Sequence, residues 1–109
     1  MNQYCVIEVA IGNEKETLKI RDALLEDRLV ASCQIVNSKS KWRWHGELEE
    51  SSEFLLIMRT KKSFIKDIYA VVQKYHSYDT FEFAVFDFYS PNSEYLDWID
   101  AETKEVKHL

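Results

Sequence analysis

The sequence predicts an α+β fold in which helices cover one face of an antiparallel sheet. Three observations lead to this prediction. Residues 41–45 alternate between polar and tryptophan side chains, which is typical of a strand with one covered face. Residues 53–60 are apolar on both faces, and residues 13–27 and 63–75 carry apolar side chains at helical spacing. The length of 109 residues favours a single domain, 1–109.

The first part of the chain predicts a strand followed by a capped helix. Residues 4–11 form an apolar run that Gly12 and Asn13 close. Asn13 is a good helix N-cap, and Glu16 follows three residues later, as in a capping box. We expect this helix to reach about Asp27. Its inner stripe consists of apolar side chains: Ile20, Ala23 and Leu24.

The middle of the chain predicts a second strand and a long hairpin. The second strand covers residues 31–36, and Asn37-Ser38 is expected to be its turn. In the hairpin, residues 41–60, the break is expected at Gly46 and the polar run 47–52. The second arm is apolar on both faces, so it needs a cover on each side.

The last part predicts helix, strand and helix. Ser63 is expected to cap a helix that runs to about Tyr75, and residues 80–89 form a strand that is again apolar on both faces. Pro91 opens a short terminal helix, and the charged tail from Glu102 is expected to fray.

With the middle hairpin merged into one extended sheet, this order gives the ferredoxin-like β-α-β-β-α-β plan, with an extended central hairpin and a short C-terminal helix. Both long helices then cover the same face of the sheet. Leaving the apolar residues of the other face in water would forfeit free energy comparable with the stability of a small domain, about 5–15 kcal/mol. We therefore expect copies of the chain to associate through this face; the alternative is that the hairpin or the terminal helix folds over it.

Composition excludes several classes of protein. The net charge of −5 argues against a nucleic-acid partner, and two glycines cannot form a phosphate-binding loop. No apolar stretch is long enough to span a membrane and the N-terminus shows no signal peptide, so the expected compartment is the cytoplasm. Cys5 and Cys33 are expected to be small buried hydrophobes.

The polar cluster His76, Tyr78, Asp79 and Glu82 is the main candidate for chemistry. A histidine with carboxylates suits a divalent cation such as copper or zinc. The alternative is a histidine favoured at a helix C-terminus by the helix dipole. His45 is expected to be exposed. No nucleophile with a base beside it is visible, so an enzyme is not expected.

Five segments of the chain resemble the CutA family, the divalent-cation tolerance proteins. The segments are LVASC (29–33), WHGELEE (44–50), FLLIMRT (54–60), HSYDTFE (76–82) and SEYLDWI (93–99). The resemblance implies a ferredoxin-like fold assembled as a homotrimer. It also implies an architecture similar to the PII signalling proteins, with ligand clefts between subunits, and a role in the response to divalent ions such as copper.

Within that resemblance, His76 and Glu82 match the histidine and glutamate of the family's H-P-Y-x-x-P-E motif, as candidate metal ligands. Trp44 and Tyr78 match its aromatic positions near the cleft between subunits, as candidate ligand-binding residues. The chain departs from the family at three positions, Ser77 and Phe81 in place of two prolines, and Ala10 in place of a metal-binding cysteine.

Three functions follow as expectations. The first is a trimer for divalent-cation tolerance that binds copper weakly. The second is a PII-like regulatory module that binds a small metabolite or anion in its clefts. The third is a structural trimer that docks a partner. The sequence identifies neither the metal nor the ligand.

Overall fold

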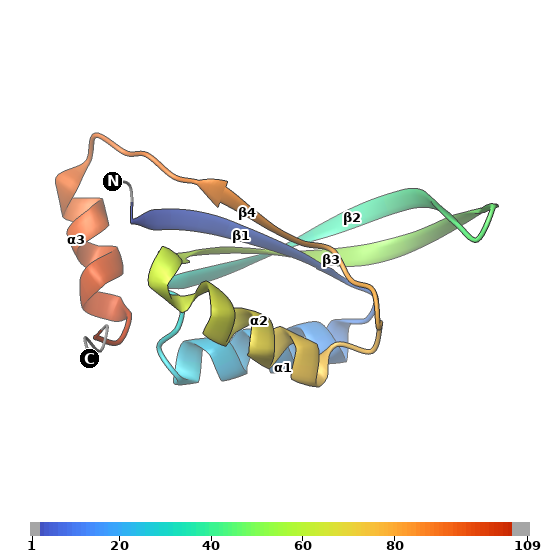
Figure 1. The fold of residues 1–109 in the computed structure, drawn as a ribbon, viewed down its shortest axis with the longest axis horizontal. Coiled ribbons are helices and arrows are strands. Elements are labelled where there is room, and N and C mark those ends of the chain that lie inside the picture. The colour runs from blue at the N-terminus through green and yellow to red at the C-terminus, as the bar shows by residue number, and fades with distance from the viewer. Residues whose placement is uncertain (1–2, 106–109) are drawn as a thin grey trace.

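The computed structural model describes residues 3–105 and confirms the predicted α+β class (Figure 1). The elements in chain order are β1 (Tyr4–Ile11), α1 (Glu14–Glu26), β2 (Ser32–Trp44), β3 (Glu47–Lys61), a short 3-10 helix (Lys62–Phe64), α2 (Ile65–Tyr75), β4 (Phe83–Asp87) and α3 (Ser93–Glu102). The four strands form one antiparallel sheet in the order β2-β3-β1-β4. This is the β-α-β-β-α-β plan with a terminal helix.

The core lies between the sheet and helices α1 and α2, which both cover the same face (Figure 1). It forms because β1 alternates strictly: every second side chain from Cys5 to Ile11 is fully buried, and the intervening ones are partly exposed. The fully buried side chains that meet β1 from the other elements are Ile20, Leu24, Leu56, Met58, Ile68 and Val72.

The predicted turn at Asn37-Ser38 and the predicted break over residues 47–52 are both wrong. β2 and β3 pair without interruption from Ser32↔Arg59 to Trp44↔Glu47, and the turn consists of His45 and Gly46, with φ of 50° and 82°. Hydrogen bonds between the two strands satisfy the backbone groups that face each other without burial, so polar side chains continue the strands. The resulting arm projects beyond the helices (Figure 1).

Three other boundaries differ from the prediction. Ser63 lies inside the 3-10 turn, and α2 begins after it without a side-chain cap. β4 has 5 residues because its pairing with β1 ends at Cys5↔Asp87. Beyond α3 the chain does not fray at once: Thr103 is buried, and the Lys104 N–H donates to the Arg28 carbonyl over 2.9 Å. His108 lies outside the described residues.

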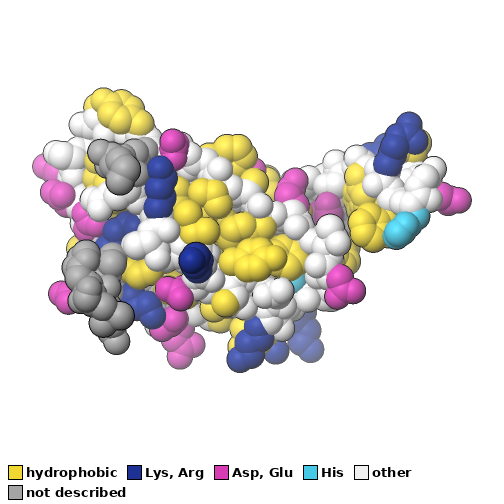
Figure 2. All heavy atoms as spheres, in the orientation of Figure 1, with side chains coloured by type: hydrophobic (Ala, Val, Ile, Leu, Met, Phe, Trp, Pro, Cys, Tyr) yellow, Lys and Arg dark blue, Asp and Glu magenta, His cyan; other side chains and the backbone are white. Residues whose placement is uncertain are grey.

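No element of residues 3–105 covers the second face of the sheet, as predicted. α3 lies beyond the strand ends and the arm extends away from the sheet, so neither folds over this face (Figure 1). Val36 and Phe86 on this face are 46% and 50% exposed, and Val6 and Ile57 between them are partly exposed. Hydrophobic side chains also gather around the edge strand β4 (Figure 2). No helix in the described part of the chain is long and apolar enough to cross a membrane.

Candidate functional site

His76 lies just after α2 and fixes the connection from α2 to β4 against the end of β1. Its side chain is fully buried. The Tyr78 backbone N–H donates to His76 Nδ1 over 3.1 Å, and Nε2 lies 2.8 Å from the carbonyl oxygen of Ala10. Nδ1 is therefore the acceptor and Nε2–H the donor, so both ring nitrogens are used inside the chain.

Glu16 on α1 holds the same connection from the other side. Its Oε1 accepts a hydrogen bond of 2.6 Å from the Ser77 backbone N–H and lies 3.6 Å from His76 Nδ1. Glu16 is itself placed by the predicted capping box, because its own N–H donates to Asn13 Oδ1 over 2.7 Å. The start of α1 and the end of α2 are thus tied together.

Gly12 makes room for Tyr78. A Cβ atom at residue 12 would overlap the Tyr78 hydroxyl, so any larger residue there must displace the ring. The Tyr78 ring lies 5.1 Å from the His76 ring, and the Phe81 ring stacks on His76 at 4.7 Å with an interplanar angle of 16°. Three aromatic rings therefore pack in sequence at the start of the connection.

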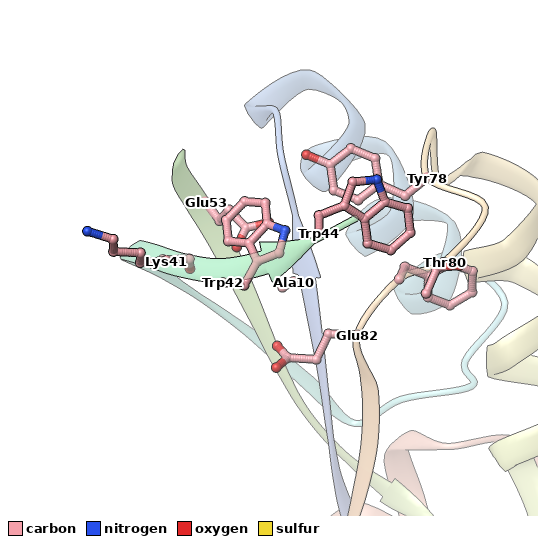
Figure 3. Close-up of a pocket in the computed structure, with 10 residues that line it drawn as sticks. Ala10, Lys41, Trp42, Trp44, Glu53, Tyr78, Thr80 and Glu82 are labelled. Atoms are coloured by element: carbon pink, nitrogen blue, oxygen red, sulfur yellow. The ribbon is translucent and has the colours of Figure 1, made fainter. Parts of the chain in front are cut away.

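A cleft of about 540 Å³ opens between this connection and the β2–β3 arm (Figure 3). Trp42 and Trp44 form its wall on the arm, and Tyr78 faces them from the connection. Glu53 of β3 and Glu82 also line it. The volume lies within the range of small-molecule sites, about 300–1,000 Å³.

A second hollow of about 340 Å³ adjoins the first and shares Trp42, Trp44 and Tyr78 with it. Glu49 and Asp79 line this second hollow. Four carboxylates therefore surround the joint space, since Glu53 and Glu82 line the first hollow, and Lys41 is the one basic residue among the lining residues. This charge favours a cation over an anion.

The structure brings three of the four predicted site residues to one place. Trp44, Tyr78 and Glu82 all line the cleft, whereas His76 lies behind it with its ring buried. Within residues 3–105 no three His, Cys, Asp or Glu side chains are grouped to hold a metal ion. A metal does not fit the residues of a single chain as they stand, and the role of His76 and Glu82 as metal ligands stays a prediction.

Two lining residues were not among the residues that the sequence predicted for the site. Trp42 and Glu53 both lie on the sheet face that carries Trp44. The period of two that relates Trp42 to Trp44 was the available signal. Glu53 pairs with Ser38 across the hairpin, and only the correct register places it at the cleft.

The two cysteines take no part in this site. Burial raises the pKa of Cys5 to about 11 and that of Cys33 to about 12, so both thiols stay protonated at neutral pH. Cys5 is fully buried, as predicted, and Cys33 is half-buried against the core. Protonated thiols of this kind are poor nucleophiles.

Residues 5–102 match the family described as CutA1 divalent ion tolerance protein. The divalent-cation tolerance protein CutA of Thermus thermophilus is 32% identical over 99 residues, which cover 90% of this chain and 96% of that protein. Protein CutA of Bos taurus is 31% identical over 98 residues, and these cover 90% of this chain and 56% of the bovine protein. The chain thus spans little more than half the length of that relative.

Solved structures share the fold. One described as divalent cation tolerance protein (Cut A1) from Thermus thermophilus superposes with a TM-score of 0.88 at 31% identity. The superposition covers 93% of this chain and 99% of the other. The overall fold of this chain is therefore one that a solved protein also has.

Proposed function

This chain belongs to the CutA1 divalent ion tolerance family, and on that premise we propose that it acts in divalent-cation tolerance, with copper as the cation to test first. The match over residues 5–102 carries the proposal, because it includes every residue that lines the cleft. The test is deletion of its gene in the source organism, followed by growth at graded copper concentrations. Growth unchanged by the deletion at every concentration would contradict the proposal.

The proposed working form is a homotrimer. The support is the uncovered face of the sheet, where Val36 and Phe86 are about half exposed and Ile57 lies between them. Burying such side chains is favourable by about 1.5–3 kcal/mol each. Sedimentation should give about three times the 13.0 kDa chain mass, and Ile57→Arg should dissociate the assembly. Ser52→Arg, at an exposed position of the same strand, makes the same change of charge and is the control; a wild-type protein that sediments at the mass of one chain would contradict the homotrimer.

Copper binding through His76 and Glu82 is the finer part of the proposal. For His76 to ligate a cation, its ring has to release Ala10 or Tyr78. A further ligand has to come from outside the described residues of one chain. Titration of copper into the wild type, Glu82→Gln and His76→Ala should show weaker binding in both variants. Equal affinity in His76→Ala removes that residue from the ligands.

A second candidate function is a regulatory module that binds a small molecule, and the cleft of about 540 Å³ favours it. Trp44 and Tyr78 are the residues proposed to contact the ligand. A ligand that binds the native state raises the melting temperature, so a thermal-shift screen of metabolites tests this function. If neither copper nor any metabolite shifts the melting temperature, a structural trimer that docks a partner is the remaining proposal. We propose the cytoplasm as the compartment and no catalysis in each case.

A further inference from the structure

The aromatic rings of the cleft provide one half of a site for an organic cation. Trp42 and Trp44 project from the same face of β2, and Tyr78 faces them across the cleft (Figure 3). Trp44 is 47% exposed and Tyr78 is 40% exposed, so their ring faces remain available to a ligand. The faces of such rings carry negative charge density and attract a cation placed over them, most strongly when water is excluded.

Glu53 provides the other half. It is 9% exposed, and no hydrogen bond or ion pair joins it to any other residue of the described chain. A carboxylate that no side chain of the described residues neutralises is available as the counter-charge for a cation in the cleft. No fully buried side-chain oxygen or nitrogen within residues 3–105 lacks a partner, so the Glu53 oxygens must reach the space that they line.

The residues that line the cleft favour an organic cation over an inorganic ion. Glu82 adds a second carboxylate, and the Lys41 ammonium points away from both (Figure 3). No set of three ligands for an inorganic ion exists within the described residues. A cavity of about 540 Å³ is also far larger than a bare metal ion needs. Aromatic walls with a carboxylate are the combination that recognises quaternary ammonium groups.

We infer that the cleft binds a small methylated ammonium ion, with Trp42, Trp44 and Tyr78 against its methyl groups and Glu53 as the counter-charge. This inference rests on the proposal that the cleft is a ligand site. It does not depend on copper binding. Trp42, Trp44 and Glu53 lie on the sheet face proposed for self-association, so sedimentation of the same samples distinguishes a cleft closed by a neighbouring copy from an open cleft that does not bind the cation.

Tryptophan fluorescence of the full chain tests the inference. In a Trp98→Phe background the signal comes from Trp42 and Trp44 alone, since Trp98 stacks on Tyr95 in α3 and does not line the cleft. Tetramethylammonium chloride should quench the signal saturably. Sodium chloride at equal ionic strength carries charge without methyl groups, and tert-butanol carries methyl groups without charge. Neither should produce saturable quenching.

Variants then assign the binding residues. Glu53→Gln should weaken tetramethylammonium binding about tenfold, and Tyr78→Leu should weaken it by a similar factor. Glu50→Gln removes the same charge from the same strand outside the cleft and should leave the affinity unchanged. Equal affinity in Glu53→Gln and the wild type would overturn the inference. No saturable quenching at all would also overturn it, as expected for a cleft filled by a neighbouring copy.

Discussion

The position of the Tyr78 ring depends on the absence of a side chain at Gly12. A Cβ atom at residue 12 would overlap the Tyr78 hydroxyl and approach ring atom Cζ to 3.1 Å. Gly12→Ala should therefore push the ring out of its place and lower the free energy of unfolding by about 1–3 kcal/mol. Urea unfolding of the variant and the wild type measures the loss.

A double variant isolates the cause of that loss. Tyr78→Phe removes the hydroxyl that the new methyl group would meet, so Gly12→Ala combined with Tyr78→Phe should recover part of the lost stability. If the two changes are simply additive, the cost of Gly12→Ala comes from the backbone and not from the tyrosine.

His76 offers a second prediction at the scale of single residues. His76→Ala removes the partners of the Ala10 carbonyl and the Tyr78 N–H, and should lower the free energy of unfolding by about 1–3 kcal/mol. His45→Asn is the control: His45 is exposed at the tip of the arm with φ of 50°, a conformation that asparagine accepts, so a change within about 0.5 kcal/mol is expected. A His76→Ala protein of full stability would show that these two bonds contribute nothing.

For single residues, the sequence predicted where the candidate site lies but not which atoms its side chains contact. The sequence motifs point to Trp44, Tyr78 and Glu82, and these three residues lie around one cleft. The burial of His76 was not predictable, because the carbonyl that it contacts belongs to Ala10, 66 residues earlier. Contacts between residues so far apart in the chain leave no periodic signal in the local sequence.

Among the elements, the β2–β3 arm shows where sequence patterns fail. Residues 47–52 are mostly acidic or serine, and such a run ordinarily indicates a loop. In the structure every one of them pairs with a residue of β2, from Trp44↔Glu47 to Lys39↔Ser52. Hydrophobic alternation reports burial, whereas this part of the arm is stabilised by backbone hydrogen bonds with little burial.

Asp100 is one of the residues that anchor the terminal helix α3. Asp100 accepts a hydrogen bond of 2.6 Å from the Tyr4 hydroxyl and lies 3.4 Å from Lys61 Nζ; burial, and then this hydrogen bond, raises the pKa of Tyr4. Asp100→Ala should lower the free energy of unfolding by about 1 kcal/mol, measured by urea unfolding. Asp97→Ala, on the same helix with an exposed side chain, should change it by less than half as much. Equal losses would mean that the anchor is not specific to Asp100.

For the molecule as a whole, the two thiols predict a loss of stability in alkali. The folded-state pKa values of Cys5 and Cys33, about 11 and about 12, lie above the ordinary 9.0 because of burial. The unfolded chain therefore releases these protons first. The contribution of the two protonated thiols to the free energy of unfolding is complete below about pH 9. It is lost as pH rises toward 11–12, and each thiol lowers the free energy of unfolding by up to ~1.4 kcal/mol per pH unit.

Urea unfolding at a series of pH values from about 8.5 to about 10 measures the slope. Cys33→Ala should make the slope shallower, and Ser32→Ala, at the neighbouring position on β2, should leave it unchanged. The slope is the quantity to compare, since each substitution also changes packing. An identical slope in Cys33→Ala and the wild type would contradict the prediction.

The topology of the whole molecule was predictable because its signals are strong. The sequence contains two helical stripes, two strands apolar on both faces and one alternating strand, and few folds accommodate this set of elements. The order of the elements along the chain then predicts that one face of the sheet is uncovered. The anchoring of the C-terminal segment was not predictable, because Lys104 bonds the backbone of Arg28 far away in the chain. A charged run such as residues 102–105 gives no sign of such a contact.

The position of β2 at the edge of the sheet has one more consequence. Along its outer side, backbone amides face solvent and find no neighbouring strand within the described chain, so their hydrogens should exchange with deuterated water quickly. A second copy that paired with this edge would slow them. Mass spectrometry of peptides from β2 over a dilution series could thus follow assembly without a label and locate the junction along the strand.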